Sequence, residues 1–204
     1  AMVLQPANVE DLTKTLADAC ARGEKVTAVR LDAFNRLLEY APEDMTVTVV
    51  AGVTLAGLQA ELAKRGQWLP IDPSRPEHVT IGAILANNES GPRRLGYGTV
   101  REHLLGIKVA LADGRVIKAG GKVVKNVAGY DLCKLFVGSR GSLGVIIEAT
   151  FKLRPLPETE QFVQTGCESL EKAGELLDAV SESELAPVVI DLHNLETRSQ
   201  KSEV

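Results

Sequence analysis

The apolar residues of the first 70 positions follow two periods, one typical of helices and one of strands. Leu12, Leu16 and Cys20 recur at four-residue spacing, which predicts a helix over 8–22 with these side chains on its apolar face. The other elements expected here are strands over 26–29, 45–50 and 67–69, a helix over 54–66 with Leu55, Leu58 and Leu62 on one face, and a short helix over 34–38.

The pattern changes at Pro157. Before it, short helices alternate with β-branched strands, and the Asp113-Gly114 turn joins two of these strands as a hairpin. The expected elements are a helix over 80–88, a loop over 89–103, strands over 105–111, 116–119 and 145–153, and a helix over 131–136. Beyond Pro157 the pattern predicts the start of a separate subdomain, with a strand over 161–165, a helix over 170–180 and a strand over 188–192.

Composition is that of an ordinary globular protein and excludes several classes. Apolar residues make up 45% of the chain, and no apolar run reaches the 18 residues of a membrane span. Residues at the N-terminus show no basic-then-apolar signal pattern, so we expect a cytoplasmic protein. The three cysteines and three histidines have no disulfide, redox or metal-ligand spacing, which predicts reduced thiols and no metal site.

Charge is unevenly distributed. Residues 91–140 hold ten Lys and Arg against three Asp and Glu, a balance of +7, whereas the whole chain carries −4 and the remainder therefore −11. A basic centre on an acidic protein favours a local anion site or an acidic partner, with a solvated cluster as the alternative. It is not the general basicity of a nucleic-acid-binding protein.

Glycine is concentrated in the same region, because ten of the 18 glycines lie within 91–141. Glycine at this density costs conformational entropy, and the usual reason for it is a backbone that turns sharply or lies against a ligand. We therefore expect residues 70–147 to form the wall of a site for a large, anionic, planar cofactor.

Two motifs in this block carry groups suited to anions. Thr80-Ile81-Gly82 begins a helix, where unpaired backbone N–H groups could bind a diphosphate, although a simple helix start explains the motif as well. In the loop 91–98, Arg93 and Arg94 could pair with a phosphate or carboxylate, and Tyr97 could stack on a ring. An exposed loop with solvated arginines is the alternative.

Two further motifs follow. The segment 125–131 places a cation, an amide, a phenol and a carboxylate just before a helix, which Asp131 could simply cap. The segment 138–144 is rich in glycine and enters a buried strand, so its backbone is expected to pass close to another group. A nucleotide base held by strand backbone atoms would fit there.

The order of these motifs resembles the FAD-binding domain of the vanillyl-alcohol-oxidase (PCMH-type) superfamily, and within it the E subunits of bacterial glycolate oxidase. The matching stretches are Pro-x-Asp-Pro from Pro70, Thr-Ile-Gly from Thr80, Gly-Pro-Arg-Arg-Leu-x-Tyr-Gly from Gly91, Lys-Asn-Val-x-Gly-Tyr-Asp from Lys125, and Gly-Ser-x-Gly-x-Leu-Gly-Val-Ile from Gly138. The resemblance covers about 5–157. It implies an α+β, two-lobed domain over 1–157, with lobes of about 1–70 and 71–157, followed by a truncated C-terminal α/β extension and tail over 158–204.

The resemblance also implies FAD, lying extended between the lobes. The positions expected to contact it are Pro73, Thr80, Ile81, Gly82, Gly91, Tyr97, Gly98 and Ile146 from the matching positions, and Arg94, Lys125, Asn126, Gly129, Tyr130, Gly141 and Gly144 from the chemistry of the motifs. The implied reaction is oxidation of a small 2-hydroxy acid such as glycolate, with hydride passing to the flavin.

The implied setting is a complex with a catalytic flavoprotein and an iron–sulfur subunit, peripheral to the inner membrane. No catalytic base is identified, since His78 and His103 are candidates by residue type alone. Lys125 or Arg94 could polarise a substrate or flavin carbonyl.

One departure puts FAD binding in doubt. Members of the superfamily carry a glycine-rich loop that wraps the diphosphate, whereas here Arg30 runs directly into Leu31. A flavin-free structural or assembly subunit that docks a catalytic partner is therefore the alternative function. A reductase of the same fold acting on a nucleotide sugar is a weaker one, because the acid/base groups it needs are not seen.

Overall fold

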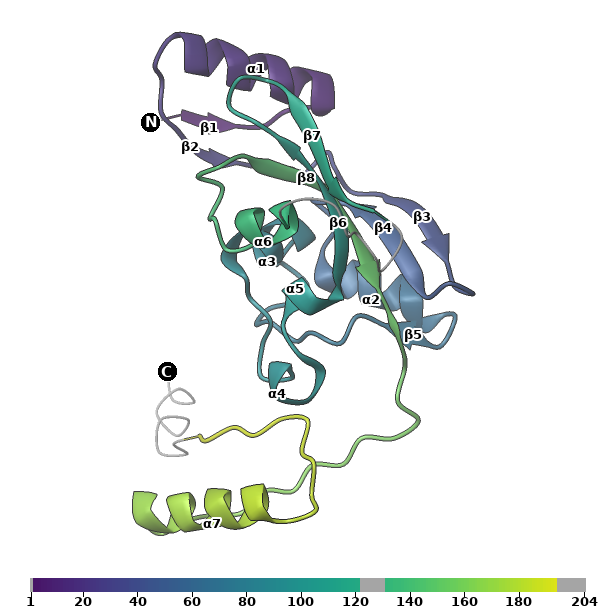
Figure 1. The fold of residues 1–204 in the computed structure, drawn as a ribbon, viewed down its shortest axis with the longest axis vertical. Helices are drawn as coiled ribbons and strands as arrows, with labels where there is room; N and C mark the ends of the chain where they lie inside the picture. The colour runs from purple at the N-terminus through teal and green to yellow at the C-terminus, as the bar shows by residue number, and fades with distance from the viewer. Residues whose placement is uncertain (1, 122–130, 194–204) are drawn as a thin grey trace, which may run out of the picture.

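The computed structural model describes residues 2–121 and 131–193, which are built around a five-stranded antiparallel sheet (Figure 1). Its strands, in the spatial order β3-β4-β8-β6-β7, are β3 (Leu37–Ala41), β4 (Thr46–Val50), β8 (Val145–Lys152), β6 (Leu104–Ala110) and β7 (Val116–Gly120). β8 is central and pairs with β4 on one side and β6 on the other. The sheet thus joins segments that lie far apart in the sequence.

Helices pack against this sheet. α3 (Ile81–Asn87) contacts β8 through its buried apolar side chains, and α6 (Leu132–Phe136) contacts β6 and β7. Figure 1 shows α3 and α6 together on one side of the sheet. The other helices nearby are α2 (Leu55–Ala63), α4 (Arg94–Tyr97) and α5 (Val100–His103). Branched and aromatic side chains such as Phe151 fill the core between sheet and helices, and their burial is the main stabilising contribution.

The N-terminus forms a β-α-β unit. β1 (Met2–Leu4) and β2 (Val26–Val29) pair in parallel, and α1 (Val9–Ala21) connects them. α1 begins at Asn8, whose side chain accepts a hydrogen bond from the Asp11 N–H. The unit packs on the β6–β7 turn at Gly114, where a β-carbon would lie 2.8 Å from the Thr13 carbonyl oxygen.

Several expected elements are confirmed, and the differences have local causes. The helix expected over 34–38 is wrong, because the chain there leads into β3, which pairs with β4 as a hairpin. The loop expected over 89–103 contains α4 and α5, and a capping box between Thr99 and Glu102 stabilises α5. On α1, Cys20 is exposed and Ala19 is buried in its place. β1 and its pairing with β2 were not expected from the pattern.

The chain leaves the five-stranded sheet after β8, and β9 (Arg154–Pro155) pairs with β5 (Gln67–Trp68) in a separate two-stranded sheet. We call residues 156–193 the C-terminal arm. It contains α7 (Leu170–Glu182), which lies apart from the sheet in Figure 1. The strands expected over 161–165 and 188–192 are absent, because no neighbouring strand is placed to pair with them.

The expected lobe boundary near residue 70 stays a prediction. β3 and β4, which precede that position, belong to the same sheet as β6, β7 and β8, which follow it. The described residues therefore form a mixed α and β structure, as expected, whose central sheet receives strands from both expected lobes.

Candidate functional site

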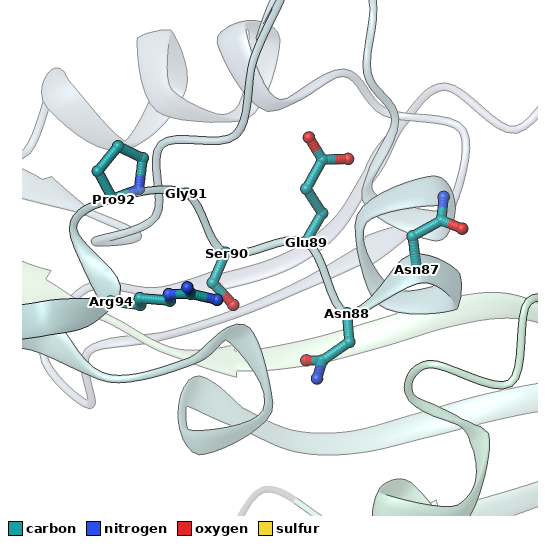
Figure 2. Close-up of a pocket in the computed structure, with 7 residues that line it drawn as sticks. All are labelled: Asn87, Asn88, Glu89, Ser90, Gly91, Pro92 and Arg94. Atoms are coloured by element: carbon teal, nitrogen blue, oxygen red, sulfur yellow. The ribbon is translucent and has the colours of Figure 1, made fainter. Parts of the chain in front are cut away.

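A cleft of about 450 Å³ opens at the C-terminal end of α3 (Figure 2). All of its lining residues come from the segment 87–94: Asn87, Asn88, Glu89, Ser90, Gly91, Pro92 and Arg94. In Figure 2 the side chains of Ser90 and Arg94 lie on one side of this segment and the Glu89 carboxylate on the other. Gly91 and Arg94 of the expected site both lie here. The cleft thus offers amide, hydroxyl and guanidinium groups, together with one carboxylate, to a polar ligand.

The loop from Pro70 to Pro73 packs directly on the segment that carries Gly91. The Asp72 N–H donates to the Ser90 carbonyl at 3.1 Å, and the Arg93 N–H donates to Asp72 Oδ1 at 2.9 Å. Gly91 has a φ of +77°, and a β-carbon there would lie 2.2 Å from Asp72 Oδ1. Glycine at position 91 is therefore required by the neighbouring loop, whether or not a ligand is present.

The Arg93 side chain joins this loop to the C-terminal arm. Its guanidinium lies 4.8 Å from the centre of the Trp68 ring and its Nε is 3.5 Å from Asp72 Oδ2. Both terminal nitrogens donate to the Glu160 carboxylate, one of them at 2.9 Å. Hydrogen bonding with Glu160 raises the pKa of Arg93, whereas burial raises the pKa of Asp72 despite the neighbouring guanidinium.

Tyr97 lies beside this group. Its ring meets Trp68 edge to face at 5.3 Å, and the Arg154 guanidinium is 5.7 Å from its centre. His103 is buried nearby, and its Nε2 has no hydrogen-bond partner among the described residues. Burial, followed by the charge of Arg154, lowers the pKa of His103, while a hydrogen bond to the Tyr97 backbone opposes this shift. The ring is thus favoured in its neutral form.

Gly98 has a local structural role. Its φ is +86°, and a β-carbon there would lie 2.6 Å from Glu102 Oε2. That carboxylate accepts a hydrogen bond from the Thr99 N–H at 2.6 Å and so closes the capping box of α5. The glycine gives the capping carboxylate room.

The beginning of α3 offers fewer free donors than expected. The Ile81 N–H donates to the Val53 carbonyl at 2.9 Å and the Gly82 N–H to the Ala51 carbonyl at 2.7 Å. The next N–H of the helix is capped by Thr80 Oγ1 at 3.3 Å. These three N–H groups are paired within the protein. A cofactor contact of Thr80, Ile81 or Gly82 stays a prediction, but its expected basis, unpaired N–H groups, is not seen here.

The join at Arg30 and Leu31 packs tightly on the same region. The Arg30 N–H donates to the Leu4 carbonyl at 2.8 Å. A β-carbon at Gly52 would lie 2.1 Å from the Leu31 carbonyl oxygen and 2.5 Å from that of Phe34. The backbone of 31–34 thus rests directly on the residue beside Ala51, whose carbonyl binds the start of α3.

The segment 138–144 closes the other end of α3. The Gly138 N–H donates to the Leu85 carbonyl at 2.9 Å and the Arg140 N–H to the Ala86 carbonyl at 2.8 Å. Gly141 is exposed with a φ of +76°, and Gly144 leads into β8, where Ile146 is buried. Gly138 therefore packs at the C-terminus of α3, whereas Gly144 lies against Val109 and Ala110 of β6. Contact of Gly141, Gly144 or Ile146 with a nucleotide stays a prediction.

Asp131 caps α6, as the simpler interpretation of its motif predicted. Its Oδ1 accepts a hydrogen bond from the Lys134 N–H at 3.1 Å, and its Oδ2 pairs with Arg101. The hydrogen bond from Arg101 helps to lower the pKa of Asp131 against the effect of burial. The expected contacts at Lys125, Asn126, Gly129 and Tyr130 lie outside the described residues.

The residues that hold this site together are not among the cofactor contacts expected from the sequence. Asp72 and Arg93 were recognised as parts of motifs, but their pairing joins loops that are separate in the sequence. Trp68 and Glu160 lay outside every motif. The chain's scarcity of aromatic residues was the available signal, since the single tryptophan was a candidate for a specific contact.

Other site types find no support in the described part of the chain. No group of three or more His, Cys, Asp or Glu side chains in residues 2–121 and 131–193 is arranged to hold a metal ion. None of the helices there is long and apolar enough to cross a bilayer. His78 is exposed and lies at a smaller hollow of about 200 Å³, 4.0 Å from Glu77. His78 is not among the residues that line the cleft of Figure 2.

Comparison with known proteins gives consistent matches. Residues 24–120 match the FAD binding domain family. The chain is 38% identical over 157 residues to glycolate oxidase subunit GlcD of Bacillus subtilis, covering 77% of this chain and 33% of that protein. It is 36% identical over 171 residues to glycolate oxidase subunit GlcE of Escherichia coli, covering 82% and 48%. It is also 42% identical over 132 residues to D-lactate dehydrogenase of Archaeoglobus fulgidus, covering 65% and 28%.

Among solved structures, alkyldihydroxyacetonephosphate synthase matches with a TM-score of 0.64 at 21% identity, over 77% of this chain and 32% of that one. This likeness shows the fold. The chain spans less than half the length of the curated relatives named above. The groups present fit FAD unevenly, because the cleft offers polar groups for a ring edge while the N–H groups at the start of α3 are already paired. By sequence, residues 24–120 belong to the FAD binding domain family.

Proposed function

We propose that this chain is the FAD-binding part of a glycolate-oxidase-like complex that oxidises a small 2-hydroxy acid. The observation that carries the proposal is the combination of the FAD binding domain match with relatives named for related substrates. Glycolate and D-lactate, which appear in the names of these relatives, are both 2-hydroxy acids. Their common chemistry is removal of a hydride from the carbon that carries the hydroxyl, which a flavin can accept.

The cleft at the end of α3 is the proposed position for the polar edge of the flavin ring. Gly91 and Arg94 line it, and Arg94 is exposed, so its guanidinium is available to a ligand. A charged donor at the edge of the ring would orient it and favour negative charge there. Pro73 lies in the loop packed on this segment, and Tyr97 and Gly98 lie at the C-terminal end of α4; these residues complete the proposed contacts.

The alternative function, a flavin-free assembly subunit, has its own support. The N–H groups of Ile81 and Gly82 are paired within the protein, and the backbone of 31–34 lies against Gly52. Both observations support a domain in which the region expected to bind a diphosphate is instead packed against other parts of the same chain. In that case the basic segment 91–140 would be the surface that docks an acidic partner.

In either form we propose a complex that includes a catalytic flavoprotein and an iron–sulfur subunit. The relatives named as glycolate oxidase subunits support such an assembly. A cytoplasmic location, peripheral to the inner membrane through the complex, goes with it.

A flavin-binding experiment decides between the two functions. The purified chain is incubated with FAD and desalted, and retained flavin is measured from its absorption bands near ~370 and ~450 nm, the signature of an oxidised flavin. We expect binding that Arg94→Ala weakens about tenfold, because a hydrogen bond from a charged donor is lost. Arg115→Ala is the control, since Arg115 pairs with Asp113 in the β6–β7 turn. No retained flavin in the wild-type chain would favour the assembly function.

A further inference from the structure

The contacts of Arg93 with Trp68 and Asp72 involve one face and the Nε atom of its guanidinium, and leave its two terminal nitrogens for another partner. Trp68 covers one face at 4.8 Å, and Asp72 lies 3.5 Å from Nε. The side chain is only 17% exposed, so its position is fixed by these neighbours. The remaining edge carries two parallel N–H donors, the geometry that matches a carboxylate.

Glu160 of the C-terminal arm occupies that edge with both carboxylate oxygens. The segment around it has no helix or strand, and the side chains of Phe162 and Val163 are 85% and 96% exposed. The Glu160 side chain is itself 38% exposed. Because the Glu160 carboxylate is reached by water and meets the guanidinium through both of its oxygens, a dissolved carboxylate of the same geometry can compete with it for these two donors.

The surroundings of this edge suit an anion near the cleft. Arg154 lies over the ring of Tyr97, which itself contacts Trp68, and so places a second positive charge near Arg93. Arg93 itself lies between Pro92 and Arg94, which both line the cleft of Figure 2. A carboxylate at Arg93 would therefore be bound by the same short segment that we propose for the flavin ring.

We propose that the terminal guanidinium edge of Arg93 is a receptor for the carboxylate group of a small 2-hydroxy acid, and that Glu160 fills this receptor when no acid is bound. The identity of the acid rests on the proposed function, whereas the carboxylate receptor rests on the contacts of Arg93. The arm is then a built-in competitor of the ligand. Removing the Glu160 charge opens the receptor.

Trp68 provides a direct readout, because it is the single tryptophan of the chain and touches the receptor. Its fluorescence is followed while sodium glycolate is added at constant ionic strength, with glycolamide as the uncharged comparison. We expect Glu160→Gln to bind glycolate at least about fivefold more tightly than the wild type. A competitor that fills the receptor four-fifths of the time weakens apparent affinity by about this factor.

Two further variants make the experiment specific. Glu158→Gln is the matched control, since it changes the same charge two positions away, and Glu158 takes part in none of the ion pairs found among the described residues. It should bind glycolate as the wild type does. Arg93→Lys keeps the charge but loses the paired donors, and should weaken glycolate binding about tenfold in the Glu160→Gln background.

The proposal is overturned if Glu160→Gln gives no saturable response, if it binds no more tightly than the wild type, or if Arg93→Lys has no effect. A thermal melt of each variant confirms that it is folded. Flavin retention is measured separately by absorption. Flavin uptake without glycolate binding would overturn the Arg93 receptor alone, and glycolate binding without flavin uptake would overturn the proposed function alone.

Discussion

Two helices of this chain, α1 and α7, are alike in sequence pattern and opposite in packing. Each has 13 residues, each begins at a side-chain cap, Asn8 or Ser169, and each has one apolar face. α1 buries Leu12 and Leu16 completely or nearly so.

In α7, by contrast, the leucines stay exposed: Leu170, Leu176 and Leu177 are 77%, 42% and 40% exposed. Its one buried residue, Ala173, does not belong to the main apolar core. An apolar face therefore predicts a helix but not its partner. α1 finds a partner because β1, β2 and the β6–β7 turn meet beside it, whereas no strand of the arm pairs near α7.

The largest expected difference between the two helices is in the cost of shortening a leucine. Leu12→Ala should lower the free energy of unfolding by about 2–5 kcal/mol, because it removes fully buried atoms and leaves a cavity. Leu177→Ala on α7 should change it by less than about 0.5 kcal/mol. Urea denaturation of both variants beside the wild type measures the difference. Equal losses would mean that α7 packs on the body as firmly as α1.

Adding a β-carbon at one glycine of the body and at one glycine of α7 tests the same difference in packing. Gly91→Ala should destabilise the body by about 2 kcal/mol or more, since its φ of +77° disfavours alanine and a β-carbon would meet Asp72. Gly174→Ala lies within α7, where nothing is within 4 Å of an added β-carbon. It should stabilise that helix by about 0.5–1 kcal/mol.

Circular dichroism reports the helix content of Gly174→Ala, and denaturation reports the stability of Gly91→Ala. A loss of helix content on Gly174→Ala would show that the arm needs this glycine for an unrecognised close contact. An unchanged stability for Gly91→Ala would show that the Asp72 loop can move away.

The sequence allowed prediction of what depends on local patterns. The helices begun by Asn8, Thr54, Thr80 and Asp131 are confirmed because a cap followed by an apolar face is a short-range signal. The hairpin at Asp113-Gly114 is confirmed for the same reason. β3 was mistaken for a helix because its identity depends on pairing with β4, which no local pattern encodes.

The candidate site was predictable only as a set of motifs. Glycine at position 91 was assigned to a ligand, whereas its immediate reason is the Asp72 loop packed against it. The pairing of Arg93 with Glu160 spans 67 positions and joins the body to an arm without regular structure. Such contacts arise from the tertiary arrangement, so residue type and spacing alone do not reveal them.

The smallest expected effect concerns the histidines of the two regions. His103 lies buried in the body, where burial and the charge of Arg154 lower its pKa. Because the folded state disfavours the charged ring, the unfolded state binds more protons as pH falls below the ordinary histidine pKa of about 6.5. Stability should therefore decrease as pH falls from about 6.5 toward the lowered pKa, by no more than about 1.4 kcal/mol per pH unit.

His103→Gln should remove this part of the pH dependence, which denaturation at a series of pH values from about 7 to 5 would measure. His193→Gln in the exposed arm is the matched control and should leave the profile unchanged, since the arm contributes little to global unfolding. A slope that survives in His103→Gln would assign the effect to other groups. The contrast between the packed body and the exposed arm would then hold for side-chain packing but not for the pH dependence of stability.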